Sequence, residues 1–595
     1  MSKETGKAFD LDLFKRLLRY TKPYKITFIA IGVAAILLSL FAAAGPFILR
    51  EIVNSYILNK DYNGLVYYSI LMVIVLMFQV LSQLYFIYYS NWLGQNIVRD
   101  LRIKLIGHML QFKMKYFDNS SVGVLVTRAV SDLERIAEIF SQGFFMIVSD
   151  LLKMLVVAVV MIIINWKLSL IVFAMFPLLL YATRLFQKAM KTAFVEVRAQ
   201  VSNINSFVQE RVTGMKIVQL FSREKREYEN FQKINKKHQD AWLKTVWYNS
   251  IFFPVAELVT SITIGLVVIY GGYQVISGSV IAENTKEIGT IFMFIQCIQV
   301  LFVPLRQIAD KFNTLQMGMV AANRVFNIID TDSSIEDNGT EVAEEIKGDI
   351  VFDKVRFGYI EGEEVLHGIS FEANVGETIA IVGSTGAGKS TIINLLSRFY
   401  EISGGTIKID GTDIKNYTLT SLREQIAVVL QDVFLFADSI LNNITLKNKD
   451  ITEEQVIAAA KAIGVHEFIS SLPGGYHYNV KERGSMLSSG QRQLISFLRA
   501  YVSNPSILIL DEATSSIDTH SEILIQQATD KITEGRTSIV IAHRLATVKK
   551  ADKIMVMEAG TIVEMGTHAE LLAKENGHYR NLYEVQFLKE RELSE

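Results

Sequence analysis

Long apolar runs occupy the first half of the chain and are absent from the second half. Six of them, each about 18–28 residues long, can cross a hydrocarbon core roughly 30 Å thick, because an α-helix rises 1.5 Å per residue. Most lack the polar stripe of a buried helix in a soluble protein. The pattern predicts six membrane-spanning helices, near residues 26–49, 65–92, 144–164, 168–188, 246–272 and 288–305.

A different pattern begins at Ile350, where short β-branched runs alternate with glycine turns and helices. This alternation is typical of an α/β domain. The segment before it is acidic, polar and poor in apolar residues, as expected of a linker. We therefore predict an all-α transmembrane domain over 1–325, a linker over 326–349 and an α/β domain over 350–595.

Composition and charge agree with this division. Half of the 595 residues are hydrophobic and only 20% are charged, which is typical of a membrane protein. The formal net charge of −1 gives no bias toward nucleic acid, so no nucleic-acid partner is expected. Cys297 is the only cysteine, which excludes an intramolecular disulfide framework and a cysteine-based zinc site.

The distribution of Lys and Arg predicts the orientation in the membrane. These residues gather before the first run, after the second and after the fourth, whereas the connection at 165–167 is very short. Basic connections lie on the cytoplasmic side. We therefore expect the N-terminus and the α/β domain to be cytoplasmic.

The two basic connections are about 50 residues long and helix-like. As helical hairpins they would extend on the order of 35 Å from the membrane. Their tips are predicted at 118–123 and 210–214. A basic face beside anionic lipid headgroups would explain the charge but not the length.

A phosphate-binding loop follows the predicted strand at 378–382. The glycines let backbone N–H groups converge on phosphate oxygens, and the helix that follows adds a favourable dipole. Lys389 would neutralise β/γ-phosphate charge, Ser390 would ligate Mg²⁺, and Thr391 would bind phosphate. The loop consists of Gly383, Ser384, Thr385, Gly386, Ala387, Gly388, Lys389 and Ser390.

A second apolar strand, at 506–510, ends in Asp511 and Glu512. In a domain with a phosphate-binding loop, such a pair indicates metal-assisted hydrolysis. Asp511 would hold Mg²⁺ through water, and Glu512 would polarise the attacking water. ATP and Mg²⁺ are therefore the expected cofactors.

The motif Leu487-Ser488-Ser489-Gly490-Gln491 resembles the signature of ATP-binding cassette (ABC) proteins, with Ser489 in place of a glycine. With the six spans and basic hairpins, the chain resembles ABC exporters of the half-transporter type. In that family the hairpin tips dock on the cassettes, and the signature contacts nucleotide on a second cassette. The resemblance therefore implies a dimer with an identical or related chain.

The same resemblance implies roles for four further residues. Tyr359 matches the aromatic that stacks on adenine, and Gln431 matches the glutamine that reaches Mg²⁺ and the attacking water. Asp518 matches the aspartate that bridges two cassettes, and His543 matches the histidine that contacts γ-phosphate. The expected catalytic residues are thus Glu512, His543 and Gln431.

Glu257 is an acid inside the fifth apolar run, and Gln296 and Gln299 lie in the sixth. An acid in a membrane span is costly and indicates function. It binds a cationic substrate, relays protons, pairs with a base on another span, or is merely wetted by a cavity. The two glutamines are candidate lining residues of the same cavity.

The leading hypothesis is ATP-driven export, or flipping between leaflets, of an amphipathic drug, lipid or hydrophobic peptide. We expect a multi-pass protein of the bacterial inner membrane. An ATP-gated channel or regulatory membrane protein of the same fold is the alternative, and Glu512 disfavours it. A soluble ABC ATPase is disfavoured by the six spans.

Overall fold

The computed structural model describes residues 10–584, apart from 278–285, 334, 336, 345, 512–518 and 543. Its contacts divide the chain into two compact units. The first comprises residues 1–110 and 121–332, and the second comprises residues 111–120 and 333–595.

The first unit is helical, and it confirms the six predicted spans. Six of its helical segments are long and apolar enough to cross a membrane. Its main helices are α2 (Lys25–Glu51), α3 (Tyr62–Met109), α7 (Phe145–Ile164), α8 (Trp166–Ala174), α9 (Phe176–Thr213), α11 (Glu224–Ser277) and α13 (Lys286–Ile329). Shorter elements are α1 (Leu11–Arg19), η1 (Lys22–Tyr24), η2 (Ile52–Ile57), α5 (Val122–Thr127), η3 (Arg128–Asp132), α6 (Leu133–Glu138) and η4 (Ile139–Phe144).

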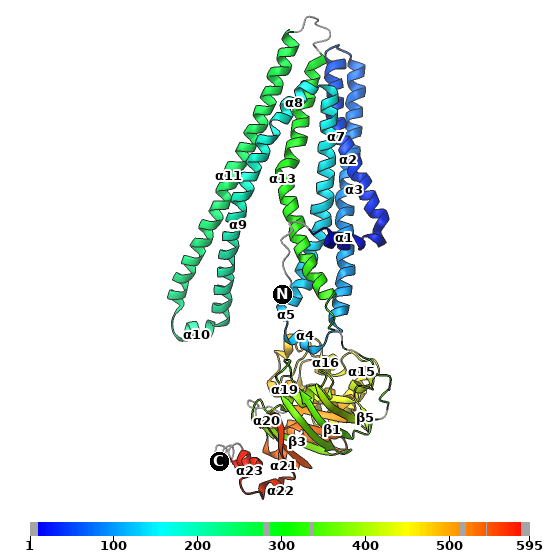
Figure 1. Ribbon diagram of the computed structural model, residues 1–595, viewed down its shortest axis with the longest axis vertical. Helices are drawn as coiled ribbons and strands as arrows, with labels where there is room; N and C mark the ends of the chain where they lie inside the picture. Colours follow the sequence, from blue (N-terminus) through cyan, green and yellow to red (C-terminus); the bar gives the residue numbers. More distant parts are fainter. Residues whose placement is uncertain are drawn as a thin grey trace. The chain divides into compact units, whose positions relative to one another are not determined.

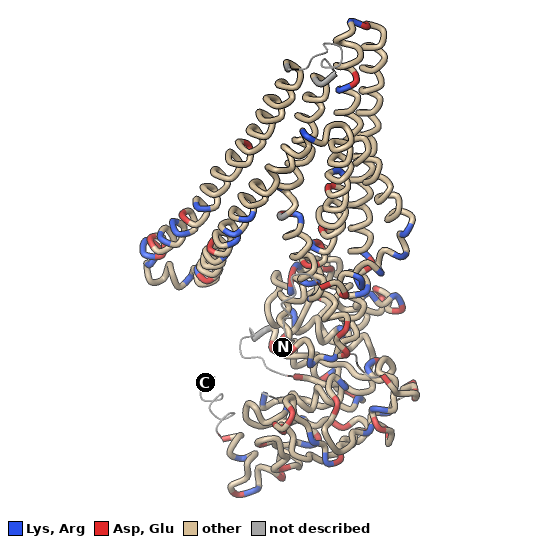
Figure 2. The backbone as a smooth tube through the Cα atoms, turned by 45° about the horizontal axis from the view of Figure 1, so that its top comes forward, with Lys and Arg blue, Asp and Glu red and all other residues tan. Residues whose placement is uncertain are grey.

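Four helices of this unit form a bundle, and two form an arm that diverges from it (Figure 1). The bundle consists of α2, α3, α7 and α13, whereas α9 and α11 pair with each other along the arm. The short helix α10 (Met215–Leu220) closes the arm, directly after the predicted tip at 210–214. Charged residues gather at that end of the arm, and the rest of both helices carries few (Figure 2).

A buried polar contact joins the end of the first span to the start of the sixth. The Gly289 N–H donates to Asn54 Oδ1 at 2.7 Å, and Arg50 Nε donates to Thr290 Oγ1 at 3.1 Å. A Cβ on Gly289 would lie 2.5 Å from the carbonyl oxygen of Arg50. Only glycine therefore allows the two helices to approach this closely.

The second unit contains two sheets. An antiparallel sheet has the order β2-β1-β4-β5, and a mainly parallel sheet has the order β10-β9-β3-β8-β7-β6. The strands of the first are β1 (Ile350–Phe357), β2 (Leu366–Ala373), β4 (Gly404–Ile409) and β5 (Thr412–Asp413). Those of the second are β3 (Thr378–Gly383), β6 (Ile426–Val429), β7 (Ile507–Asp511), β8 (Thr537–Ile541), β9 (Lys553–Glu558) and β10 (Thr561–Gly566).

Helices between these strands complete the unit, and the predicted α/β class is confirmed. Apolar side chains of β3, β7 and β8 alternate between two hydrophobic clusters, one on each face of the parallel sheet. The helices are α14 (Lys389–Leu396), α15 (Leu419–Glu424), α16 (Ile440–Thr445), α17 (Glu453–Ala462), α18 (His466–Ser471), η5 (Gly475–His477), η6 (Glu482–Gly484), α19 (Ser489–Val502), α20 (Thr519–Thr533), α21 (Leu545–Lys550), α22 (His568–Leu572) and α23 (His578–Leu582).

Residues 111–120 of the first basic hairpin, including the start of its predicted tip at 118–123, belong to the second unit. This segment contains α4 (Met114–Asp118), which ends where the tip at 118–123 was predicted to begin. The Lys113 N–H donates to the Ser333 carbonyl at 2.7 Å, and the Ile335 N–H donates to the Gln111 carbonyl at 3.1 Å. The helix α13 runs to Ile329, into the start of the predicted linker 326–349. The linker and the hairpin tip are thus paired through their backbones.

The Asn54–Gly289 contact gives a prediction for stability. Replacing Asn54 with alanine leaves the Gly289 N–H without this acceptor, at a cost of about 1–3 kcal/mol. We expect a lower apparent unfolding temperature for purified Asn54→Ala in detergent, followed by intrinsic fluorescence. Asn59→Ala is the matched control, because within the described part of the chain the exposed Asn59 amide bonds only to the Ser55 carbonyl. Equal unfolding temperatures for Asn54→Ala and the unmodified protein would contradict the prediction.

Candidate functional site

Parallel pairing brings the candidate nucleotide residues to one edge of the larger sheet. Strands β6, β7, β8 and β3 are mutually parallel neighbours, so their carboxyl ends meet at the same edge. Gly383 ends β3, Asp511 ends β7, and Gln431 closely follows β6. His543 follows β8 in sequence but lies outside the described residues.

The phosphate-binding loop has a backbone that depends on glycine. Gly383 has φ 152°, and a Cβ there would lie 2.2 Å from the Met557 carbonyl oxygen on the neighbouring strand β9. Gly388 has φ 96° and precedes α14 directly. Ser384, Thr385 and Gly386 are exposed. The loop therefore presents accessible backbone at a helix N-terminus, which is a favourable place for phosphate.

Lys389 is almost buried at the start of α14. Its Nζ donates to the carbonyl oxygens of Gly383 at 2.7 Å and Ser384 at 3.0 Å. Burial lowers the pKa of the Lys389 ammonium, and the charge of Asp511 opposes this effect. Two carbonyls thus hold the ammonium in place without neutralising it.

Tyr359 lies against the same helix. Its hydroxyl donates to Thr391 Oγ1 at 3.3 Å and accepts from Asn394 Nδ2 at 3.1 Å. Its ring packs edge to face on Tyr400, with 5.1 Å between ring centroids and 89° between planes. The aromatic residue selected by sequence position is therefore next to the phosphate-binding loop.

Tyr400 was missed by the sequence analysis, although it connects this region to α4. Its hydroxyl donates to the carboxylate of Asp118, the last residue of α4. Burial and this hydrogen bond both raise the pKa of Tyr400. The only sequence signal for Tyr400 is its position just after α14.

The signature motif lies at the start of α19. Ser488 is the N-cap: its Oγ accepts from the Gln491 N–H at 3.2 Å, and the Gln491 side chain accepts from the Ser488 N–H at 3.0 Å. Leu487 and Gly490 are buried, whereas Ser488 and Ser489 are exposed. Ser489 is the first residue of the helix, so its side chain needs no unusual backbone conformation.

Of three other predicted site residues, the structure describes Gln431 but not Glu512 or Asp518. Gln431 is exposed, and the apolar side chains of Leu430, Phe434 and Phe436 near it are exposed too.

The first unit gives Glu257 a partner. Glu257 Oε2 lies 3.4 Å from Arg306 Nη1, and Arg306 Nη2 donates to Thr260 Oγ1 at 2.6 Å. Gln296 is half-buried and Gln299 is exposed. Of the roles considered for Glu257, pairing with a base on another span is the one that this geometry favours.

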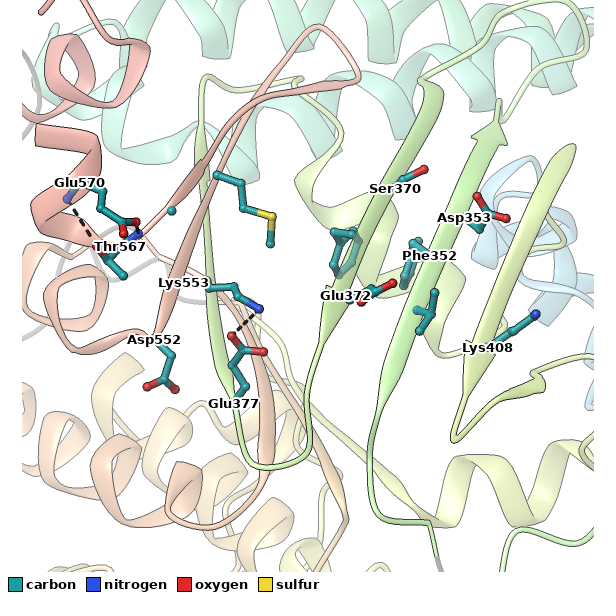
Figure 3. Close-up of a pocket in the computed structure, with 14 residues that line it drawn as sticks. Phe352, Asp353, Ser370, Glu372, Glu377, Lys408, Asp552, Lys553, Thr567 and Glu570 are labelled. Atoms are coloured by element: carbon teal, nitrogen blue, oxygen red, sulfur yellow. Dashed lines mark hydrogen bonds and ion pairs between the residues drawn. The ribbon is translucent and has the colours of Figure 1, made fainter. Parts of the chain in front are cut away.

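A cleft of about 900 Å³ lies elsewhere in the second unit (Figure 3). Lys553 forms an ion pair with Glu377 at 2.7 Å, while Asp552 accepts from the Thr378 N–H at 2.8 Å. Glu570 accepts from the Thr567 N–H at 2.9 Å. Three of the carboxylates that line this cleft are therefore engaged in contacts within the domain.

Comparison with known proteins agrees with both units. Residues 28–305 match the family model of the ABC transporter transmembrane region, and residues 366–515 match the ABC transporter family model. The uncharacterised ABC transporter ATP-binding protein YknV of Bacillus subtilis is 35% identical, over 98% of this chain and 96% of its own length.

Two further relatives have names that state an activity. The putative multidrug export ATP-binding/permease protein YgaD of Bacillus subtilis is 34% identical, over 97% of this chain and 100% of its own. The ATP-dependent lipid A-core flippase of Syntrophus aciditrophicus is 34% identical, over 98% of this chain and 96% of its own. Identity of this extent, over both units, shows that the chain belongs to the ABC transporter family, as an exporter-type half-transporter that uses ATP to drive export or flipping.

Proposed function

We propose that two such chains form a dimer that moves an amphipathic substrate out of the cytoplasmic leaflet by alternating access. The substrate is an amphipathic drug, lipid or hydrophobic peptide. The observation that carries the proposal is the continuous contact from Thr391 through Tyr359 and Tyr400 to Asp118. It joins the nucleotide end of the cassette to a segment that continues into the membrane helices.

ATP would bind across the loop between β3 and α14. The exposed loop N–H groups would hold the phosphates, and Lys389 would exchange its two carbonyl partners for phosphate oxygens. Ser390, Gln431 and Asp511 offer hydroxyl, amide and carboxylate oxygens, which suit Mg²⁺, and bound Mg²⁺ would neutralise phosphate charge. Glu512 would polarise the attacking water, and His543 would contact the γ-phosphate.

The second chain would complete each site. The exposed start of α19 offers N–H groups and the positive end of a helix dipole to a γ-phosphate held by the other cassette. Asp518 would bridge the two cassettes. The partner is an identical or a related chain, and the exposed, unstrained Ser489 is compatible with either.

Two exposed apolar surfaces are candidates for a further contact between chains. On α10 and just after it, Ile217, Leu220 and Phe221 are exposed. On the cassette, Leu430 and Phe434 flank the Gln431 region and are also exposed. We infer that α10 of one chain covers this region of the other, because burying both surfaces removes apolar area from water.

Coupling within one chain would run through Tyr400. If adenine stacks on Tyr359, any displacement of the Tyr359 ring would displace the Tyr400 ring that packs against it. The hydrogen bond from the Tyr400 hydroxyl to Asp118 would then transmit this displacement to α4. The backbone pairing of residues 111–113 with 333–335 would move the linker together with α4.

The basic connections support a cytoplasmic N-terminus and cassette, in a multi-pass protein of a bacterial inner membrane. The relatives named above are bacterial. An ATP-gated channel is less well supported, because two relatives are named for export or flipping.

Removing the Glu512 carboxylate tests the proposed function directly. We expect Glu512→Gln in proteoliposomes to bind ATP but to lose about a hundredfold or more of its ATPase activity, and all ATP-driven substrate movement, because water activation is lost. Glu534→Gln is the control, since Glu534 is exposed and, among the residues that the structure describes, forms an ion pair only with Lys531. Sustained transport by Glu512→Gln would overturn the mechanism.

Removing one hydroxyl tests the coupling route. Tyr400→Phe keeps the ring that packs on Tyr359 but loses the hydrogen bond to Asp118. We expect the stimulation of ATPase by substrate to fall several-fold, with the KM for ATP within about twofold, since a hydrogen bond to a charged group contributes about 1.5–3 kcal/mol.

Two variants complete this coupling experiment. Asp118→Ala should have the same effect as Tyr400→Phe, and the double variant should add nothing further. Tyr417→Phe is the control, because its hydroxyl bonds to the Ile409 carbonyl, away from α4. Additive effects of Tyr400→Phe and Asp118→Ala would contradict the route.

Pairing with Arg306 predicts the behaviour of Glu257→Gln. Because the carboxylate is paired with a guanidinium, its loss should reduce transport of cationic and neutral probes to the same extent. Transport into inside-out vesicles measures both, with Glu196→Gln as a control that breaks an ion pair to Lys244 on the arm. A loss confined to cationic probes would show direct recognition of the cation instead.

A further inference from the structure

Three helices of the first unit line an open pocket of about 560 Å³, here called the Arg184 cavity. Most of its wall is apolar, and α7, α9 and α13 contribute Ile147, Leu180, Leu305, Ile308 and Phe312. Its polar side chains all come from one stretch of α9, namely Thr183, Arg184 and Gln187. The cavity is therefore amphipathic, with its polar part on a single helix.

Arg184 differs from Lys311 and Arg306, two basic residues of α13 in the same part of the chain as the cavity lining. Lys311 pairs with Asp150, which also lies 3.5 Å from Lys153, and Arg306 pairs with Glu257. Among the residues that the structure describes, no carboxylate pairs with Arg184, and its side chain is exposed. The Thr183 hydroxyl, in contrast, donates to the Leu179 carbonyl at 2.8 Å. The Arg184 guanidinium is thus a cationic group in the cavity lining that can bind an anionic ligand.

Helix lengths place the Arg184 cavity near the cytoplasmic face of the bilayer. Arg184 lies about 27 Å of helical path beyond Trp166, at 1.5 Å per residue. Ile147 and Leu305 lie about 26 Å from Ile164 and Ile288, the outer ends of their spans, by the same measure. The hydrocarbon core is roughly 30 Å thick, so all three elements reach the inner interface here.

We propose that the Arg184 cavity binds a transported amphiphile with one anionic headgroup and an apolar chain, which enters from the cytoplasmic leaflet. This inference rests on the transport function proposed above and names the substrate class. The guanidinium suits a phosphate or carboxylate, because its planar fork donates two parallel hydrogen bonds. The Gln187 amide can add a third, and the apolar wall accommodates the chain.

An arginine at this depth has another possible ligand. A long cationic side chain can reach the interface and bind headgroups of the surrounding bilayer without any role in transport. A bilayer lipid of this kind would not stimulate ATP hydrolysis in a manner that depends on Arg184. Stimulation of ATPase therefore separates a transported ligand from a bound bilayer lipid.

The experiment uses the full-length protein in nanodiscs of phosphatidylcholine. Two probes with the same acyl chain are compared, lysophosphatidylglycerol with an anionic head and lysophosphatidylcholine with a zwitterionic head. For each probe the concentration that gives half-maximal ATPase stimulation is measured. We expect Arg184→Gln to raise this concentration about tenfold or more for the anionic probe, and less than twofold for the zwitterionic probe.

Two further variants identify the cause. Lys188→Gln removes a neighbouring exposed cation of α9 that does not line the Arg184 cavity, so its response to both probes should match the unmodified protein. Arg184→Lys keeps the charge but not the planar fork, so it should give an intermediate shift. The response to the zwitterionic probe reports whether each variant is folded.

Three outcomes would overturn the inference. These are equal shifts for both probes, equal shifts in Arg184→Gln and Lys188→Gln, or an unchanged half-maximal concentration for the anionic probe in Arg184→Gln. An unmodified protein that hydrolyses ATP without a response to either probe would also overturn it, yet would leave ATP-driven transport of other amphiphiles intact. Absence of ATP hydrolysis altogether would instead contradict the proposed function itself.

Discussion

Parallel pairing of β3, β8 and β7 is the constraint on which the rest of the cassette depends. It places the ends of these strands at one edge, so that the loop carrying Lys389 and the carboxylate of Asp511 face the same space. The close contact between Gly383 and β9 anchors that loop. Because the sheet is buried on both faces, this geometry is rigid.

The membrane unit meets a different requirement. Two of its basic side chains, Lys311 and Arg306, are paired with Asp150 and Glu257, which reduces the cost of charge within or beside the bilayer. Paired charges contribute little net field to a passing substrate. Specificity would then depend on the few groups that remain unpaired and on the shape of the apolar walls.

The sequence predicted those features that are encoded locally. Apolar run length identified the six spans, and a strand followed by a glycine-rich loop predicted the nucleotide site, because both patterns are complete within a few dozen residues. Contacts between distant residues could not be predicted in this way. Tyr400 and Asp118 are 282 positions apart, and Arg306 and Glu257 are 49 positions apart. Only the structure shows that Ser489 is the first residue of α19, where its side chain needs no unusual backbone conformation.

The pairing of residues 111–113 with 333–335 also bears on how the protein is made. The backbone groups of Gln111 and Lys113 have their partners in a segment that follows all six spans in sequence. Because synthesis proceeds from the N-terminus, the first hairpin tip cannot form these backbone hydrogen bonds until residues 333–335 have been synthesised. The pairing of the tip with residues 333–335 would therefore occur only after the sixth span has been made. A chain arrested earlier would expose Phe112 and α4, a surface that quality-control proteases can recognise.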